Sequence, residues 1–391
     1  MRAPTTTGQG PSTHADVVVA TSITHFAPAE WNLLFPGELE DWSYFHAAET
    51  AGMSDFEWLY FGVREGDRWR AFAPAFLSEY RLDTTLDGGL RRVVRSLARA
   101  VPSLLCPRLL ALGSPVGERF QIGFAPDAGD EERARLFGCV LDACEEQAAL
   151  RGARMVAIKD ASDAQSEAWL QVLRGRRMRR QPGLPTATLA LPFDSIDGYL
   201  ASLSRATRKD LRRKLRTRPL LRVEWRRDLE GIRDQVARLY KNTLDRATMQ
   251  FEELTGDFFA QVMAGSEGRA RCVCYWLDDQ MIAFNLVLVG DDRLIDKYIG
   301  MDYRHARDLN LYYLSWIENI QHAIEHRIPL FQSGQGLPEE KLRLGSTLSA
   351  NWLWYRHRNR LIDRTMQVAE HALGLHRPEV LNALPQRRER A

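Results

Sequence analysis

The 391-residue sequence contains no long run of apolar residues. A helix that crosses a bilayer needs about 20 consecutive apolar residues, and no stretch approaches that length, so we expect no transmembrane helix. Residues 1–15 are rich in Thr, Pro, Gly and Ser and lack an apolar centre. They predict a flexible tail and not a signal peptide. The expected location is therefore the cytoplasm.

Cysteine is also scarce, with five residues in the whole chain. Five scattered cysteines are too few for a disulfide framework in a chain of this size. Cys272 and Cys274 face the same way on an expected strand, but no second Cys/His pair completes a metal site. We expect buried, reduced thiols and no bound metal.

Positive and negative charges are nearly balanced, since 53 basic and 51 acidic residues give a net charge of +2. Several catalytic signatures are also missing. The sequence has no nucleophile elbow, no Walker loop, no HExxH and no dinucleotide fingerprint with its acidic partner. The chemistry therefore has to be sought in a less regular group of polar residues.

The chain is about twice as long as a typical domain, and 45% hydrophobic with 27% charged residues is ordinary for a globular protein. We expect two α/β domains, at residues 16–192 and 193–365, followed by a helix and tail at 366–391. Each half predicts a strand hairpin, a glycine-containing segment, a long helix and a further strand. This shared order indicates a duplicated unit, although no residue-level repeat is present.

The expected elements follow from the hydrophobic patterns. In the first half they are strands at 58–63, 69–80, 155–160 and 186–191, and a helix at 130–150. In the second half they are helices at 229–246 and 255–264, a hairpin at 271–277 and 281–289, and a closing aromatic strand at 351–358.

Residues 293–345 form the stretch around which the chain is organised. A strand at 294–301 leads through a polar turn to a helix, with Asp308 as its expected N-cap. The face of this helix carries Leu309, Tyr313, Ile317, Ile320 and Ile324. A second strand at 328–331 then runs into a glycine-rich corner. This is a βαβ pattern, and its ligand site should lie beyond the carboxyl ends of the strands.

A polar group surrounds this stretch. Its members are Asp296, Tyr298, Asp302, Arg304, His305, Arg307, Asn310, Gln335 and Lys341. Asp296 and Tyr298 alternate along the strand, so we expect them on one side together with Gly300. An acid and a phenol suit proton transfer, and a buried hydrogen-bonded pair is the alternative.

Residues 199–216 predict a basic helix between the halves. On a helix Arg205, Lys209, Arg212 and Arg216 form one stripe, with Arg208 beside it. Such a stripe can dock the phosphates of a nucleotide, a tRNA or a phospholipid, or it can be a solvated face.

The second half resembles a GNAT-superfamily acyltransferase domain. Lys297-Tyr-Ile-Gly-Met-Asp-Tyr-Arg304, the long helix, Gly334-Gln-Gly336 and Lys341-Leu-Arg-Leu-Gly345 resemble the branch related to the Fem peptidoglycan aminoacyltransferases. That branch includes proteins labelled peptidoglycan biosynthesis or recognition factors. The likeness extends over roughly residues 30–360.

The resemblance implies tandem GNAT-like folds, with mixed central sheets flanked by helices, that transfer an activated acyl group to an amine. Splayed strands at 294–301 and 330–334 would hold the carbonyl, and the turn at 304–309 would face a pyrophosphate. Relatives that use acyl-CoA usually carry glycines in that turn. Both are missing here, so Arg304 and Arg307 are the expected phosphate clamps.

Residue by residue, the implied catalytic groups are Lys341, Tyr298, Asp296 and His305. The implied donor or phosphate contacts are Arg304, Arg307, Asn310, Gln335, Gly336, Arg208, Lys209 and Arg212. The expected co-substrate is an acyl-CoA type of donor with no tightly bound cofactor, and the acceptor is a small-molecule or peptide amine. Two alternatives are an aminoacyl-tRNA-dependent transferase acting on a cell-wall precursor or peptide, and a degenerate binding module of the same fold.

Overall fold

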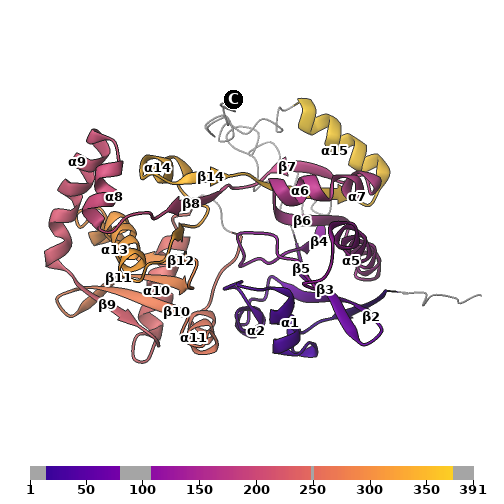
Figure 1. Cartoon of the computed structure of the whole chain (residues 1–391), viewed down its shortest axis with the longest axis horizontal. Helices are drawn as coiled ribbons and strands as arrows, with labels where there is room; N and C mark the ends of the chain where they lie inside the picture. Colours follow the sequence, from indigo (N-terminus) through magenta and orange to yellow (C-terminus); the bar gives the residue numbers. More distant parts are fainter. Residues whose placement is uncertain (1–14, 80–106, 248–250, 373–391) are drawn as a thin grey trace, which may run out of the picture.

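The computed structural model describes residues 15–79, 107–247 and 251–372. Two mixed β-sheets lie side by side with helices on their faces (Figure 1). The α/β class with two mixed sheets is thus as expected. The predictions made for residues 1–14, for Cys106 and for the tail beyond residue 372 lie outside the described residues.

The first sheet has the order β1-β2-β3-β4-β6-β15-β7, with β5 paired to β3. Its strands are β1 (Asp16–Ala20), β2 (Glu57–Glu65), β3 (Arg68–Glu79), β4 (Arg108–Leu112), β5 (Gly123–Phe124), β6 (Met155–Ser162), β7 (Arg179–Pro182) and β15 (Asn351–His357). Its helices are η1 (Ile23–His25), α1 (Pro28–Leu34), α2 (Trp42–Thr50), α5 (Asp130–Leu150), α6 (Asp163–Ala168), α7 (Leu170–Gly175) and α15 (Arg360–Ala372).

The second sheet has the order β14-β8-β13-β12-β11-β10-β9. Its strands are β8 (Thr186–Ala190), β9 (Arg222–Arg226), β10 (Ala270–Leu277), β11 (Gln280–Val289), β12 (Leu294–Met301), β13 (Leu330–Gln332) and β14 (Thr347–Ser349). Its helices are α8 (Ile196–Ser202), α9 (Arg205–Lys214), η3 (Leu215–Leu220), α10 (Arg233–Leu244), α11 (Gly256–Gly265), α12 (Tyr303–Ala306), α13 (Leu311–Glu325) and α14 (Pro338–Arg343).

The two sheets exchange strands. β8, which precedes the boundary expected at residue 192, pairs antiparallel with β13 and β14 of the second sheet. β15, near the end of the described chain, returns to the first sheet and lies between β6 and β7. The strands at these positions were predicted correctly, but each belongs to the sheet of the other half. The ranges 16–192 and 193–365 therefore do not coincide with the two sheets.

Local patterns were the most reliable guide. The two hairpins, β2–β3 and β10–β11, and the helix α5 lie where alternation and helical periodicity predict them. The unit β12–α13–β13 has the parallel pairing of a βαβ crossover. The basic segment, however, is two helices. It breaks because Leu203 is extended and the Ser204 hydroxyl accepts a hydrogen bond from the Thr207 N–H, which caps α9.

The corner before α13 also differs from expectation. Asp302, and not Asp308, caps a helix there: its side chain accepts a hydrogen bond from the Arg304 N–H at the start of α12. Asn310 precedes α13 in the left-handed conformation, with φ of 55°, and its side chain makes no capping bond. The buried face of α13 is also rotated from the expected one, since Leu311 and Leu314 are buried and Tyr313 is only half-buried.

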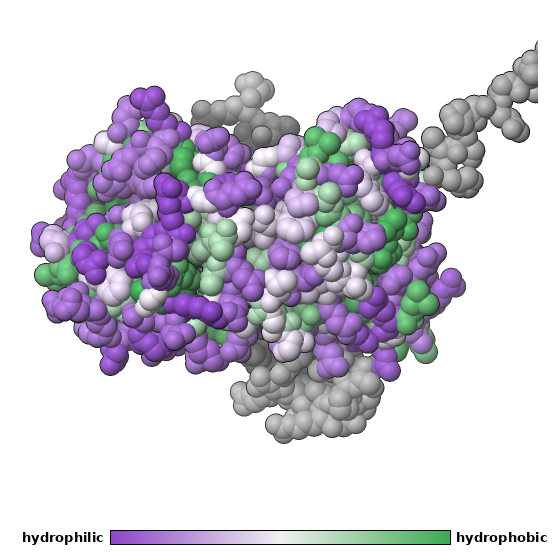
Figure 2. All heavy atoms as spheres, turned by 90° about the horizontal axis from the view of Figure 1, so that it is seen from below, coloured by the Kyte–Doolittle hydropathy of each residue, from purple (hydrophilic) through white to green (hydrophobic). Residues whose placement is uncertain are grey.

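One hydrophobic core is shared by the two halves. It joins α2 and the inner face of the first sheet to α10 and α11 of the second half. Separate cores lie beneath α5 and around α8, α9 and α13. Hydrophilic residues cover most of the face shown in Figure 2, with hydrophobic ones scattered among them. The two halves are therefore joined through a continuous apolar interior.

In the ranges that the structure describes, no helix combines the length and the apolar character needed to span a bilayer. Cys272 and Cys274 are buried on β10 with their sulfur atoms 3.6 Å apart, as expected of core thiols.

Gly300 is where α10 packs directly on β12. A Cβ atom there would lie 2.6 Å from the backbone nitrogen of Tyr240 and 2.3 Å from a ring carbon of Phe284. We predict that Gly300→Ala lowers the free energy of unfolding by about 3 kcal/mol, because backbone has to move to relieve the overlap. Urea denaturation measures this. The matched control is Gly175→Ala, whose Cβ meets nothing within 4 Å; an equal loss in the control would contradict this explanation.

Candidate active site

The parallel strands β12 and β13 separate after a short stretch of pairing. Their register pairs Leu294 with Phe331 and Ile295 with Gln332, and pairing then ends. The next amide of this segment, Ser333 N–H, donates instead to Ala187 O on β8 at 3.0 Å. Beyond this point, the region between Asp296 on β12 and the residues that follow β13 is lined by polar groups, and a Cβ atom on Gly334 would lie 3.6 Å from Asp296 O. This is the splay that the sequence resemblance implied.

Lys341 reaches into this space from α14. The side chain is buried, and its Nζ donates a hydrogen bond to Ser333 O. Burial lowers the pKa of Lys341, although Asp296 and Glu118 nearby oppose the change. The residue predicted as catalytic is thus an enclosed ammonium group and not a surface lysine.

Glu118 enters the same space from the other half, on the connection between β4 and β5. Its Oε2 accepts a hydrogen bond from Gln332 Nε2 at 3.1 Å. A Cβ atom on Gly334, which has φ of 67°, would lie 3.3 Å from Glu118 Oε1 and 3.6 Å from Lys341 Nζ. The carboxylate and the ammonium therefore border one small space. Burial raises the pKa of Glu118, while Lys297 acts against the rise.

Gln335 and Asn351 hold the loop that carries Glu118. The Gln335 Nε2 group donates to the carbonyl oxygens of Glu118 at 3.1 Å and Leu184 at 3.3 Å. Asn351 Nδ2 donates to Leu184 O at 3.0 Å. Gln335 is therefore engaged in joining the halves. Gly336 beside it is exposed and has open space around it.

Asp296 and Tyr298 lie on opposite faces of β12, so the expectation that they share a side is wrong. The register shifts between their partners on β11 and leaves Lys297 as a bulge, which interrupts the alternation of side chains. Asp296 accepts a hydrogen bond from Asn285 Nδ2 at 2.6 Å, on the side of α13. Burial raises the pKa of Asp296.

Tyr298 points to the opposite side, toward the first half. Its ring packs edge-on against Tyr240 and Phe258. Its hydroxyl donates to Val116 O at 3.3 Å and lies 3.5 Å from the hydroxyl of Tyr44. Burial raises the pKa of Tyr298 well above its ordinary value, so the phenol stays protonated.

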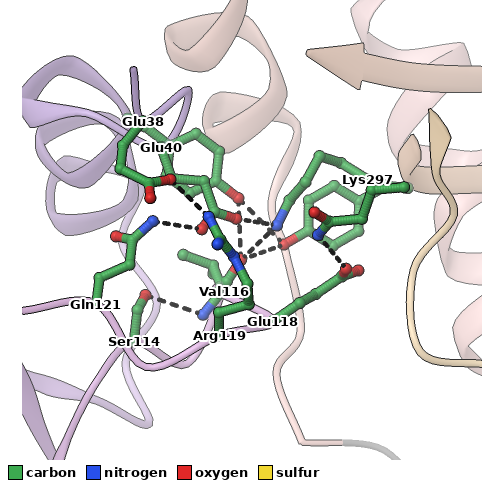
Figure 3. A network of polar contacts seen from close by, with 12 residues as sticks. Glu38, Glu40, Ser114, Val116, Glu118, Arg119, Gln121 and Lys297 are labelled. Carbon is green, nitrogen blue, oxygen red and sulfur yellow. Dashed lines mark hydrogen bonds and ion pairs between the residues drawn. The ribbon is translucent and has the colours of Figure 1, made fainter. Parts of the chain in front are cut away.

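The bulged residue Lys297 is at the centre of the contacts between the halves (Figure 3). Its side chain is 1% exposed, and its Nζ forms an ion pair with Glu40 and donates to Val116 O at 2.9 Å. Gln121 Nε2 donates to the other oxygen of Glu40 at 3.0 Å. Burial alone would lower the pKa of Lys297, but the negative charge of Glu40 outweighs it and the pKa is raised.

A further carboxylate completes the polar surroundings. Glu252 follows α10 and is half-buried, and burial raises its pKa to about 7 despite the positive charges of Lys159 and Lys297. Lys159 itself is engaged, since its Nζ donates to Gly117 O at 2.8 Å and pairs with Asp160.

The other predicted residues lie apart from this site. Arg304 is paired with Asp302 through Nε–Oδ1 at 3.0 Å and Nη2–Oδ2 at 2.5 Å, and this holds the pKa of Asp302 down at about 2. Arg307 is exposed, His305 is half-buried, and Asn310 Nδ2 contacts Asp308 O at 3.5 Å. This corner follows the carboxyl end of β12, away from Lys341. Its role in holding phosphate stays a prediction.

The basic residues on α9 form a third group. Arg208 donates to Ala201 O at 3.1 Å, Lys209 is exposed, and Arg212 lies 3.7 Å from Asp197. The helix is tied to α14 by Arg343 and Asp210 at 3.3 Å. A ligand role for the exposed cations of α9 stays a prediction.

Sequence reasoning did not identify the individual residues of the first half that contact Lys297 and approach Lys341. Glu40, Val116 and Glu118 lie in segments without a recognisable motif, and Glu252 lies beside Glu253 in a loop that also lacks one. Lys297 was inside the quoted strand but was not singled out. The one available signal was the lysine itself, a charged residue beside Asp296 in a largely apolar strand, which needs a partner when it is buried.

The pairing of Lys297 with Glu40 generates a stability prediction. We expect Glu40→Gln to lower the free energy of unfolding by about 3 kcal/mol, because the buried ammonium loses its counter-charge. The matched control is Glu57→Gln, which breaks an exposed pair with Arg108 and should cost less than about 1 kcal/mol. Chemical denaturation of both variants measures the difference. Equal losses would mean that Lys297 is hydrated and that its pairing is not critical.

Residues 204–342 match the family model described as an acetyltransferase (GNAT) domain. Among solved structures, FemX is 15% identical with a TM-score of 0.58, over 90% of this chain and 99% of that one. A tandem GNAT protein from the clavulanic acid biosynthesis pathway is 11% identical with a TM-score of 0.51, over 88% of this chain and 99% of that one.

The C-terminal domain of a putative lysylphosphatidylglycerol synthetase from Agrobacterium fabrum is 13% identical with a TM-score of 0.50, over 85% of this chain and 92% of that one. No curated protein matches. At these identities the structures show a shared fold, and the family match covers the segment that carries β9 to β13. The GNAT resemblance expected from the sequence is thus confirmed: the chain carries a GNAT acetyltransferase domain within a fold that it shares with FemX and a tandem GNAT protein.

Proposed function

We propose that this protein is an N-acyltransferase that moves an acyl group from an acyl-CoA type of donor to an amine. The observation that carries the proposal is the meeting of Glu118 and Lys341 where β12 and β13 diverge. One residue comes from each half, so the reaction centre would be complete only in the docked molecule.

The donor carbonyl would enter the gap between the diverging strands. Backbone N–H groups along the diverging strands would hold its oxygen there. Lys341 Nζ would stabilise the negative charge that develops on that oxygen as the amine attacks. Lys341 can act in this way only while it is protonated, that is, at pH values below its lowered pKa.

Glu118 would be the general base of the reaction. An acceptor enters as an ammonium ion and has to lose a proton before its nitrogen can attack. Glu118 would take that proton, a C–N bond would form and the thioester C–S bond would break. The attacking nitrogen would then lose its second proton, which balances the proton that the leaving thiolate takes up. Its raised pKa makes Glu118 a stronger base than an exposed carboxylate.

The charges around the space suit a cationic acceptor. Two of the lysines are already paired, Lys297 with Glu40 and Lys159 with Asp160. The carboxylates of Glu118 and Asp296 then act on the ammonium of Lys341, and Glu252 adds negative charge near Glu118. This excess of acid favours an incoming ammonium group over an anionic acceptor.

We predict a bell-shaped dependence of kcat/KM on pH for release of free thiol from acetyl-CoA in the presence of an amine panel. The rate should fall as pH drops through the raised pKa of Glu118, because the base becomes protonated. It should fall again as pH rises through the lowered pKa of Lys341, because the ammonium is lost. Glu118→Gln should abolish the acid limb and reduce the rate by about 10²–10⁴-fold.

The control for the identity of the base is Glu252→Gln. Glu252 has a pKa of about 7, so it could itself produce an acid limb near that pH. An acid limb that survives Glu118→Gln and disappears in Glu252→Gln would assign the base to Glu252. Lys341→Ala with unchanged turnover would remove the site from this position. Donor and amine binding without any turnover would favour the degenerate binding module.

A further inference from the structure

A hollow of about 410 Å³ lies at the carboxyl end of β12, next to the turn that lacks glycines. One wall is the face of α10 and the residues after it, with Arg238, Asn242 and Arg246 spaced at i, i+4 and i+8. The other wall is Asp302, Tyr303 and Arg304 at the start of α12. Three arginine side chains from two separate elements thus converge on one concave surface.

Two of these arginines have their charge available. In the described part of the chain, Arg238 makes no ion pair, and Arg246 has its guanidinium 4.4 Å from the centre of the Tyr303 ring and no carboxylate partner. Arg304 is neutralised by Asp302. The remaining acid of the hollow, Asp245, is paired with Lys241 outside it at 2.7 Å. The negative end of the α10 dipole lies here too, so the arginines alone make the hollow attractive to an anion.

The position of the hollow fits a donor that reaches from phosphate to reaction centre. Met301 comes five residues after Asp296 on β12, a span of about 17 Å in an extended strand. The arm that joins the thioester of an acyl-CoA to its diphosphate is an extended chain of comparable length. A concave site with two available guanidinium groups also matches a compact diphosphate better than a long polyanion.

We infer that Arg238 on α10 and Arg246 just after it, with Arg304 beside them, bind the phosphate groups of a nucleotide-diphosphate acyl donor of the CoA class. The inference rests on the proposed function and adds the residues that recognise the donor. Guanidinium side chains from α10 and the residues after it take the place of the glycine-rich backbone turn. Neither Arg238 nor Arg246 was expected from the sequence, because the motif comparison pointed only to the turn itself.

The experiment is calorimetric titration of the full-length protein with CoA and with pantetheine, which lacks the phosphates. The wild type should bind CoA more tightly than pantetheine. The double variant Arg238→Ala/Arg246→Ala should lose about tenfold or more in CoA affinity while pantetheine affinity is unchanged, since two charge-assisted contacts are removed. Arg238→Lys/Arg246→Lys should retain part of the preference. The matched control is Arg64→Ala, an exposed arginine on β2 of the other half.

The outcomes separate the inference from the proposed function. Two results would overturn the arginine site but leave a CoA-type donor in place. One is a double variant that binds CoA with the affinity of the wild type, and the other is a double variant that loses affinity equally for CoA and for pantetheine. Failure of the wild type to bind CoA would overturn both the inference and the CoA class of donor. Loss of CoA affinity in Arg64→Ala of the same size would also overturn it.

Discussion

The ammonium group of Lys297 is buried where the two halves meet, and its charge has to be balanced there. Removing such a group from water costs several kcal/mol, which only close partners can offset. Both groups to which its Nζ donates hydrogen bonds come from the first half, the Glu40 carboxylate and the Val116 carbonyl oxygen. The position of one half relative to the other is therefore tied to this contact (Figure 3).

The same contact determines where Glu118 lies. Val116 is two residues before Glu118, so the loop that accepts the Lys297 hydrogen bond also delivers the carboxylate to Gln332. Gln335 holds that loop through the Glu118 carbonyl. Buried charge thus serves two purposes here, since it joins the halves and orients a residue of the candidate site.

The exchange of β8 and β15 reinforces this arrangement. Each strand has hydrogen-bonded neighbours from the other half, so separating the halves would break sheet pairing as well as the shared core. A site assembled from two halves needs such rigidity, because a reacting group that is misplaced by about 1 Å loses much of its effect. The architecture explains how Glu118 and Lys341, far apart in the sequence, can face the same small space.

The sequence by itself determined the local elements and the class of fold. Periodicity placed α5, both hairpins and the βαβ unit, and the residues around Lys341 carried the GNAT resemblance. These depend on contacts between near neighbours, which a local pattern records. Tertiary structure alone decided which sheet β8 and β15 join, that the bulge at Lys297 turns Asp296 away from Tyr298, and that Glu118 completes the site. Those features arise from contacts between distant segments, and the burial of charge that selects them leaves no periodic trace in the sequence.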